Sequence, residues 1–141
     1  MGLRDGALFW LRPVHAQSLR VGISKSQQPS EVVLEVAAWY PFTALVVHST
    51  SWRVDRGGVV LTFCAVVPDT NGRESRPVRR ADLARGGTTE AAANILEAQV
   101  IEHGLRHLSW LVTDDEVVGR ALGPAWAVVL KDYVPEPFRP L

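Results

Sequence analysis

The sequence contains a single cysteine, which excludes an intramolecular disulfide. Cys64 lies inside the apolar run 59–67, and we expect it to be a small buried hydrophobic residue. A reactive thiol needs a neighbouring base or a helix start that lowers its pKa, and the sequence around Cys64 offers neither. One unpaired thiol suits a reducing compartment, so we expect a cytoplasmic protein.

An excess of charge of one sign is also missing. The 15 lysine and arginine side chains balance 15 aspartate and glutamate side chains, and the net charge is +0 at pH 7. Such a chain creates no overall field that would attract nucleic acid or an anionic membrane. We therefore expect neither of these among its partners.

Long hydrophobic runs and signature motifs are absent as well. No basic segment followed by an apolar run opens the chain, and the longest uncharged stretch, 36–52, is interrupted by Pro41. These features argue against a signal peptide and against a transmembrane helix. No Walker loop, dinucleotide fingerprint, zinc-finger cysteine set or kinase signature occurs, and we expect no cofactor.

Alternating apolar residues indicate two neighbouring strands. Every second residue of 42–54 and of 59–67 falls on one strand face, and turn-forming residues 55–58 separate the two segments. Pairing across this turn places Trp52 opposite Leu61. Because the shared face is almost wholly apolar, we expect it to lie on the core side.

Periodicity changes along the rest of the chain. Segments 7–11, 19–23 and 32–39 are expected to be further strands, and 89–112 is expected to be a long helix. The apolar residues that repeat at intervals of three and four along this helix are Ala91, Ile95, Ala98, Ile101, Leu105, Leu108 and Val112. We expect them to form its core-facing stripe.

Two shorter helices are expected after the long one. Thr113 and Glu116 have the spacing of a capping box, in which Thr113 accepts the amide of the third helical residue and Glu116 reaches back. Gly123 and Pro124 then end this helix, and a third is expected over 125–133.

These patterns together predict one domain, 1–141. Its composition, 47% hydrophobic and 21% charged residues, is that of an ordinary globular protein. Strands come first and helices after, an order typical of the α+β class. We expect an antiparallel sheet of about four to six strands in the N-terminal half. The helix 89–112 and the shorter C-terminal helices are expected to pack against it.

The long helix carries two histidines that are candidates for function. His103 and His107 are four residues apart, so both rings lie on one helix face, together with Leu96, Val100 and Trp110. Three interpretations remain open for the pair. The histidines border a packed or dimeric surface, they line a pocket that binds or protonates a ligand, or they coordinate a metal.

A polar group of residues interrupts the first of the two paired strands. Its members are His48, Ser49, Ser51, Trp52 and Arg53. Polar side chains in mid-strand can mark a ligand pocket, to which the helix would add His103, His107 and Trp110. The same pattern also fits a strand whose serines and arginine face solvent. A metal site would need a third ligand beside the helix histidines, and His48 is the candidate.

An arginine-rich segment precedes the long helix. Arg79, Arg80 and Arg85 come shortly before Gly86-Gly87, and guanidinium groups near a helix start can bind an anion such as phosphate. Acidic residues lie among them and offset part of this charge. A solvated charged connection is the other interpretation.

The region 86–105 resembles the surroundings of the Nudix box. The resemblance rests on a strand, a loop with Gly86-Gly87, and a helix that ends in residues 102–105, Glu-His-Gly-Leu. In this alignment the Arg-Glu pair of the box falls on Glu97 and Ala98. Of its paired metal-binding glutamates, Glu102 remains, with Ile101 in the other place. The resemblance therefore implies a Nudix-like scaffold that lacks part of the catalytic set.

Because no catalytic motif is complete, the sequence favours a non-enzymatic binding or assembly module. Two apolar faces on the long helix suggest that it forms a homodimer through its helical half. The alternative is a small-molecule enzyme, either a Nudix-like hydrolase or a protein with a histidine-based metal site. Its ligand pocket would be lined by His48, His103 and His107.

Overall fold

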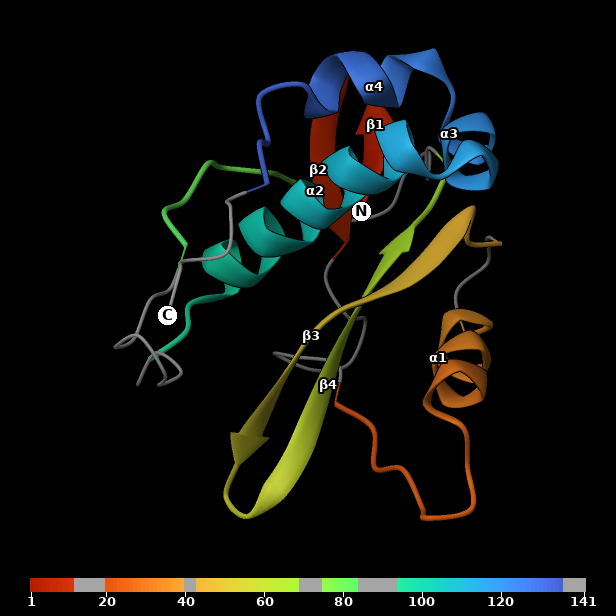
Figure 1. Ribbon diagram of the computed structural model, residues 1–141, viewed down its shortest axis with the longest axis vertical. Coiled ribbons are helices and arrows are strands. Elements are labelled where there is room, and N and C mark those ends of the chain that lie inside the picture. Colours follow the sequence, from red (N-terminus) through yellow and green to blue (C-terminus); the bar gives the residue numbers. More distant parts are fainter. Residues whose placement is uncertain (12–19, 40–42, 69–74, 84–93, 136–141) are drawn as a thin grey trace. The chain divides into compact units, whose positions relative to one another are not determined.

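The computed structural model describes residues 1–11, 20–39, 43–68, 75–83 and 94–135. Within these ranges, five strands form two antiparallel sheets and are accompanied by four helices, of which the last three are C-terminal (Figure 1). The α+β class predicted from the sequence is confirmed. The strands, however, are divided between two sheets rather than joined in one.

The elements have the following bounds. They are β1 (Gly2–Arg4), β2 (Ala7–Leu11), α1 (Pro29–Ala37), β3 (Val46–Asp55), β4 (Gly58–Val66), β5 (Ser75–Pro77), α2 (Glu97–Asp114), α3 (Glu116–Leu122) and α4 (Pro124–Leu130). Contacts between Cα atoms divide the chain into two compact units, 1–51 with 61–77 and 52–60 with 78–141. None of the helices in the described ranges combines the length and the apolar character that crossing a membrane requires.

The first unit contains the three-stranded sheet, in the order β1-β2-β5. The strand predicted at 7–11 is confirmed as β2, whereas β1 and β5 were not predicted. Asp5 and Gly6 connect β1 to β2 and both have positive φ, 50° and 76°. An Asp-Gly pair is the usual sequence of such a two-residue hairpin turn, so it was the signal for β1. β5 lies within 73–87, the arginine-rich segment before the long helix, for which the sequence predicted no strand.

Two strand predictions in the first unit are wrong. The segment 32–39 belongs largely to the helix α1, and residues 20–23 form no strand; Leu19 lies outside the described residues. Pro29 starts α1 at a position where its fixed φ and missing N–H suit a helix. Val32 and Val36, one helical turn apart, are buried. Their burial at a spacing of four overrides the strand preference of valine.

Strands β3 and β4 form the predicted hairpin (Figure 1). Arg56 and Gly57 make its turn, with φ of 49° and 80°. The expectation that its apolar face is the core side is wrong at the turn end, where Trp52 and Leu61 are exposed. Alternation identifies the residues that share a strand face, but it does not show whether another layer covers that face.

The buried residues of the hairpin lie at the end away from the turn. Thr50 is buried, and its hydroxyl donates to the Thr62 carbonyl oxygen over 3.3 Å. Cys64 and Val66 of β4 are also buried, as predicted for the thiol. The backbone amide of Val67 donates to the Met1 carbonyl oxygen over 2.8 Å. These contacts join the start of the chain to the end of β4 in the core of the first unit.

The second unit contains three helices, α2, α3 and α4, which contact one another (Figure 1). The long helix begins at Glu97 rather than at residue 89: residues 94–96 are not helical, and 89–93 lie outside the described residues. The side chain of Gln99 closes the first turn by accepting the Leu96 amide over 2.9 Å. Leu105 and Leu108 of the predicted stripe are fully buried, whereas Ala98 is exposed.

The start of α3 differs from the predicted capping box. Asp115 caps it, because its Oδ1 accepts the amides of Val117 and Val118 over 2.9 and 3.1 Å. Thr113 instead lies in the last turn of α2, where its hydroxyl donates to the Ser109 carbonyl oxygen over 3.2 Å. Gly123, with φ of 75°, separates α3 from α4 as predicted, but α4 ends at Leu130 rather than at residue 133.

Candidate functional site

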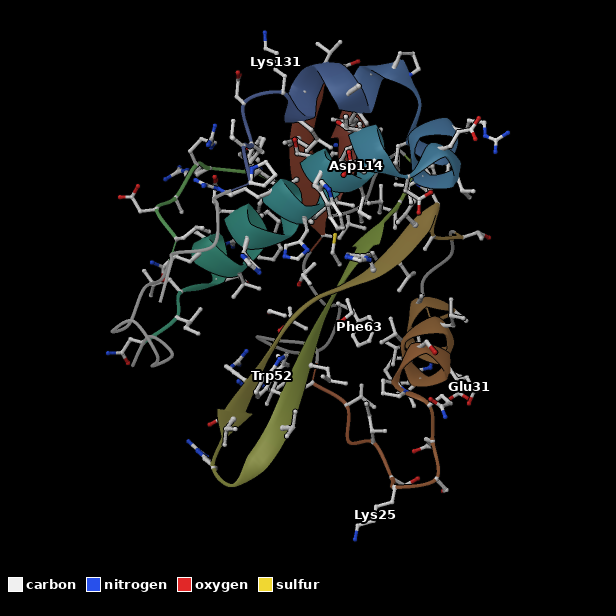
Figure 2. All side chains as sticks on the ribbon, viewed as in Figure 1. Lys25, Glu31, Trp52, Phe63, Asp114 and Lys131 are labelled. Carbon is white, nitrogen blue, oxygen red and sulfur yellow. The ribbon has the colours of Figure 1, made fainter. Side chains whose placement is uncertain are left out.

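The predicted ligand-binding residues of β3 lie on both faces of the strand. His48 is half-buried, and burial lowers its pKa. Ser49 is exposed, while Ser51 and Arg53 are half-buried. Trp52 lies in the turn half of the hairpin (Figure 2) and is exposed. Because successive side chains of a strand point to opposite faces, the two serines and Arg53 share one face, and His48 and Trp52 share the other.

The two predicted histidines of α2 are brought together. The ring centroids of His103 and His107 are 4.7 Å apart, and their planes meet at 63°. Both side chains are half-buried, and Nδ1 of His107 is buried. Trp110 is 49% exposed one turn further along, and its indole N–H donates to Asp114 at the end of the same helix. α2 therefore positions a histidine pair beside a partly exposed tryptophan.

The predicted three-histidine site combines residues of different units. His48 belongs to the first unit, and His103 and His107 belong to the second. Among the residues that the structure describes, no group of three or more histidine, cysteine, aspartate or glutamate side chains is arranged to hold a metal ion. A shared pocket or metal site of all three histidines stays a prediction.

The predicted anion-binding arginines do not form one group. Arg79 is exposed, and Arg85 lies outside the described residues. Arg80 makes a bidentate ion pair with Glu102: its Nε donates to Oε2, and its Nη2 donates to Oε1, both over 3.0 Å. The charge of Arg80 is thus compensated within the chain, because its planar guanidinium group binds both oxygens of a carboxylate of the protein.

Glu102 is the centre of a polar cluster that the sequence did not predict. Its side chain is fully buried, with 0% exposure. Besides Arg80, its carboxylate accepts Nε of Arg106 over 3.0 Å and the Ala81 amide over 3.3 Å. Each oxygen therefore accepts two hydrogen bonds. The available signal was the acid and arginine four residues apart on the predicted helix, a spacing that favours an ion pair.

The electrostatics of this cluster are set by opposing effects. Burial by itself raises the pKa of Glu102, but the hydrogen bonds from Arg80, Arg106 and the Ala81 amide lower it more. The net result is a pKa below the ordinary glutamate value. Glu102 is therefore ionised near neutral pH.

The Glu102 cluster also holds the C-terminal segment. The Arg80 guanidinium lies 4.2 Å from the centroid of the Tyr133 ring, and Nη1 of Arg106 donates to the Val134 carbonyl oxygen over 3.3 Å. Burial raises the pKa of Tyr133, so its ring carries a neutral hydroxyl near neutral pH. These contacts connect the segment after β5, helix α2 and the residues after α4. The cluster acts as a clamp inside the second unit.

The Glu102 contacts bear on the Nudix-like interpretation, in which this residue would be the remaining metal-binding glutamate. Both carboxylate oxygens are occupied by donors of the protein. Two positive guanidinium groups flank the carboxylate, and a bound cation would have to displace them. The geometry suits a structural ion pair better than a metal ligand.

An exposed apolar surface lies at the turn end of the hairpin. We call it the tip face; its residues are Trp52, Val54 and Val59, all of the second unit. Trp52 is 69% exposed, Val54 67% and Val59 66%. Exposed single apolar residues are common, but three on one face of a hairpin end are a cluster of the kind found at interaction surfaces.

No family, curated protein or solved structure matches the chain.

Proposed function

We propose that the chain is a binding and assembly module whose contact surface is the tip face, and that the occupant of this surface is a second copy of the chain. The observation that carries the proposal is the exposure of Trp52, Val54 and Val59 on one face of the hairpin. Tryptophan in such a position is the residue type that most often dominates the energetics of an interface.

The tip face is preferred to the helix face that the sequence suggested. On that face of α2, the middle residues Val100, His103 and His107 are half-buried, and the strongly exposed residues Leu96 and Trp110 stand at its ends. The residues of the tip face come from two paired strands, β3 and β4. Two copies can bring identical apolar faces together about a two-fold axis, the commonest arrangement of homodimers.

The size of the tip face sets the expected strength of association. Its three side chains expose on the order of 400 Å² together. A stable dimer buries about 800 Å² on each partner, so the tip face alone supports a weak, concentration-dependent dimer.

Sedimentation equilibrium over a wide range of protein concentration tests this proposal. We expect wild-type mass to rise from monomer to dimer, and Trp52→Ser to raise the dissociation constant by about tenfold or more. Trp39→Ser is the matched control, because Trp39 is also 69% exposed but lies after α1. A wild-type monomer at every concentration, or an equal effect of both variants, would contradict assembly through the tip face.

A small-molecule enzyme remains the second candidate, and the close approach of His103 and His107 supports it. An imidazole of such a pair can accept a proton from a bound ligand, and its imidazolium form can return it. Native mass spectrometry of the purified chain tests this alternative. A retained small molecule that disappears when both histidines are changed to leucine would favour it over assembly.

A further inference from the structure

The contacts of Arg80 in the Glu102 cluster are those that select a guanidinium group. Arg80 donates to both carboxylate oxygens of Glu102 over 3.0 Å, and its guanidinium lies 4.2 Å from the centroid of the Tyr133 ring. A carboxylate that accepts two N–H groups, with an aromatic face beside it, matches the planar fork of arginine. A lysine ammonium is a compact point charge and cannot make the bidentate contact.

The segment that carries Arg80 is held by few buried side chains. Residues 78–83 form no helix or strand, and each of them is exposed or half-buried. The Arg80 side chain is 51% exposed, whereas that of Glu102 has 0% exposure. Arg80 therefore reaches the buried carboxylate from the surface. Segments with little buried apolar contact are the ones that open locally at low free energy, so residues 78–83 can release Arg80 without unfolding α2.

The charges around Glu102 also allow Arg80 to leave. Nε of Arg106 donates to the same carboxylate over 3.0 Å from the same helix, so Glu102 keeps an ion pair without Arg80. Asp132, next to Tyr133 in the chain, adds a negative charge that acts on Arg80. Two acids against one remaining arginine attract a further cation.

We propose that Glu102 and Tyr133 form an arginine-binding site, that Arg80 occupies it as a tethered internal ligand, and that an arginine side chain of a partner peptide can take its place. A short tether gives the internal ligand an effective concentration on the order of millimolar, so an isolated arginine competes poorly with Arg80. Arg80 thereby inhibits the site unless the partner supplies further contacts. This inference does not depend on the tip face.

NMR titration with the capped peptide acetyl-Gly-Arg-Gly-amide tests the proposal. We expect Arg80→Ala to bind the peptide at least about tenfold more tightly than the wild type, because the internal competitor is gone. The same peptide with lysine in place of arginine should bind Arg80→Ala about tenfold more weakly. The amide resonances of Glu102 and Tyr133 should shift on binding, and in the wild type they should shift at higher peptide concentration.

Two further variants locate the bound peptide. Arg79→Ala is the matched control, because Arg79 is exposed and adjacent in the chain, and it should bind as the wild type does. Adding Glu102→Gln to Arg80→Ala should abolish the gain in affinity. If Arg80→Ala alone does not fold, its refolding in ethylguanidinium replaces the titration. Recovery of helical circular dichroism in ethylguanidinium but not in ethylammonium would support the site, and no such recovery would contradict it.

Three results would overturn the proposal. Equal affinity of Arg80→Ala for the arginine and lysine peptides would mean that the site responds to charge alone. Equal affinity of Arg80→Ala and Arg79→Ala would mean that Arg80 does not compete with the peptide. Resonances of the wild type that do not move at about a hundredfold the dissociation constant of Arg80→Ala would mean that Arg80 is a permanent structural contact. The tip-face dimer is tested separately, through different residues and the mass of the particle.

Discussion

Glu102 brings a full negative charge into the interior of the second unit, where two arginines compensate it and the Ala81 amide donates a further hydrogen bond. Such an arrangement adds little net stability compared with an apolar core, because both charges must leave water. Removing one partner is different, since it leaves the opposite charge unpaired. Substituting Glu102 should therefore destabilise the fold, even though the ion pairs of Glu102 add little net stability.

We expect Glu102→Gln to destabilise the chain by about 3 kcal/mol, the lower end for breaking a buried ion pair. The lower end applies because the Arg80 side chain is 51% exposed and can turn toward water. Urea unfolding measures the change. Glu97→Gln is the control, because Glu97 is exposed on the same helix and its loss should change the free energy of unfolding by less than about 1 kcal/mol. Equal effects of the two variants would contradict the clamp.

Glu102 also predicts how stability depends on pH. Its pKa is lower in the folded chain than in the unfolded chain, so the unfolded chain binds more protons as the pH falls through that interval. The free energy of unfolding should therefore decrease below the ordinary glutamate pKa of about 4.3. In Glu102→Gln this part of the acid dependence should disappear. If the free energy of unfolding of Glu102→Gln falls with decreasing pH as steeply as that of the wild type, other carboxyl groups cause the acid dependence.

Cys64 should be almost unreactive in the folded chain. Burial raises the pKa of its thiol to about 11. From the thiolate population alone, labelling below pH 8 should be about three-hundredfold slower than in the unfolded chain. Reaction with a chromogenic disulfide reagent, with and without denaturant, measures the ratio. Rapid labelling of the native chain would show that Cys64 is accessible.

The two residues differ in how far the sequence could predict them. The burial of Cys64 followed from its position in an apolar run. Glu102 is charged, and charged residues are rarely buried without a partner. Its main partner, Arg80, is distant in the sequence, and no local pattern connects them. The pairing depends on tertiary packing, which periodicity does not describe.

At the scale of elements, the local backbone conformation of turns and helix ends gives direct predictions for single substitutions. The turn of the β3–β4 hairpin has positive φ at Arg56 as well as at Gly57. Glycine adopts this conformation readily, whereas a residue with a Cβ is strained in it. Arg56 is thus the less favourable of the two turn residues.

Arg56→Asn should stabilise the hairpin by about 0.5 kcal/mol, because Asn-Gly is the preferred pair in a two-residue turn with positive φ at both positions. Thermal unfolding of the variant and the wild type gives the difference. Asp55→Asn is the control: it introduces the same side chain before the turn and should give no such gain. A loss of stability in Arg56→Asn would mean that the arginine side chain has a favourable contact.

Asp115→Ala should destabilise α3 by about 1 kcal/mol, the usual effect of losing an N-cap side chain. Thr113→Ala, which would remove the cap expected from the sequence, should have a smaller effect because Thr113 lies inside α2. Denaturant unfolding of the two variants compares them. If Thr113→Ala lost more stability than Asp115→Ala, the predicted capping box would be favoured over the Asp115 cap.

Element types were predicted best where one pattern acts alone. Alternation over β3 and β4 identified the hairpin, and Gly123 and Pro124 marked the boundary of α3 and α4. In α1, valines that favour a strand are spaced as in a helix, and the two signals conflict. The burial of Val32 and Val36 decides between them, but burial is a property of the folded chain.

At the scale of the whole molecule, the balance of charge limits the forces that can drive association. With a net charge of +0, long-range attraction between copies is absent. An apolar contact through the tip face does not require long-range electrostatic attraction. The prediction of an assembly module drew on this neutrality, on the lack of a complete catalytic motif and on the two apolar faces of the long helix, whereas the proposal of the tip face rests on the exposure of Trp52.

Self-association should therefore depend little on salt. We expect the dissociation constant of the dimer to change by less than about threefold between low and high ionic strength, because screening acts on charges. Sedimentation at several salt concentrations measures this dependence, with Trp52→Ser as the control that removes the apolar contribution. A steep fall of affinity with salt would instead indicate an ionic contact, such as one made by the exposed Arg79.

The position of the only thiol has a consequence for handling and for biology. Since Cys64 is buried in the first unit, two folded chains cannot bring their sulfur atoms together. A covalent dimer on a non-reducing gel would consequently record that some chains had opened and been oxidised. Such a band would report how much of the sample had unfolded and oxidised, and it would not report native assembly.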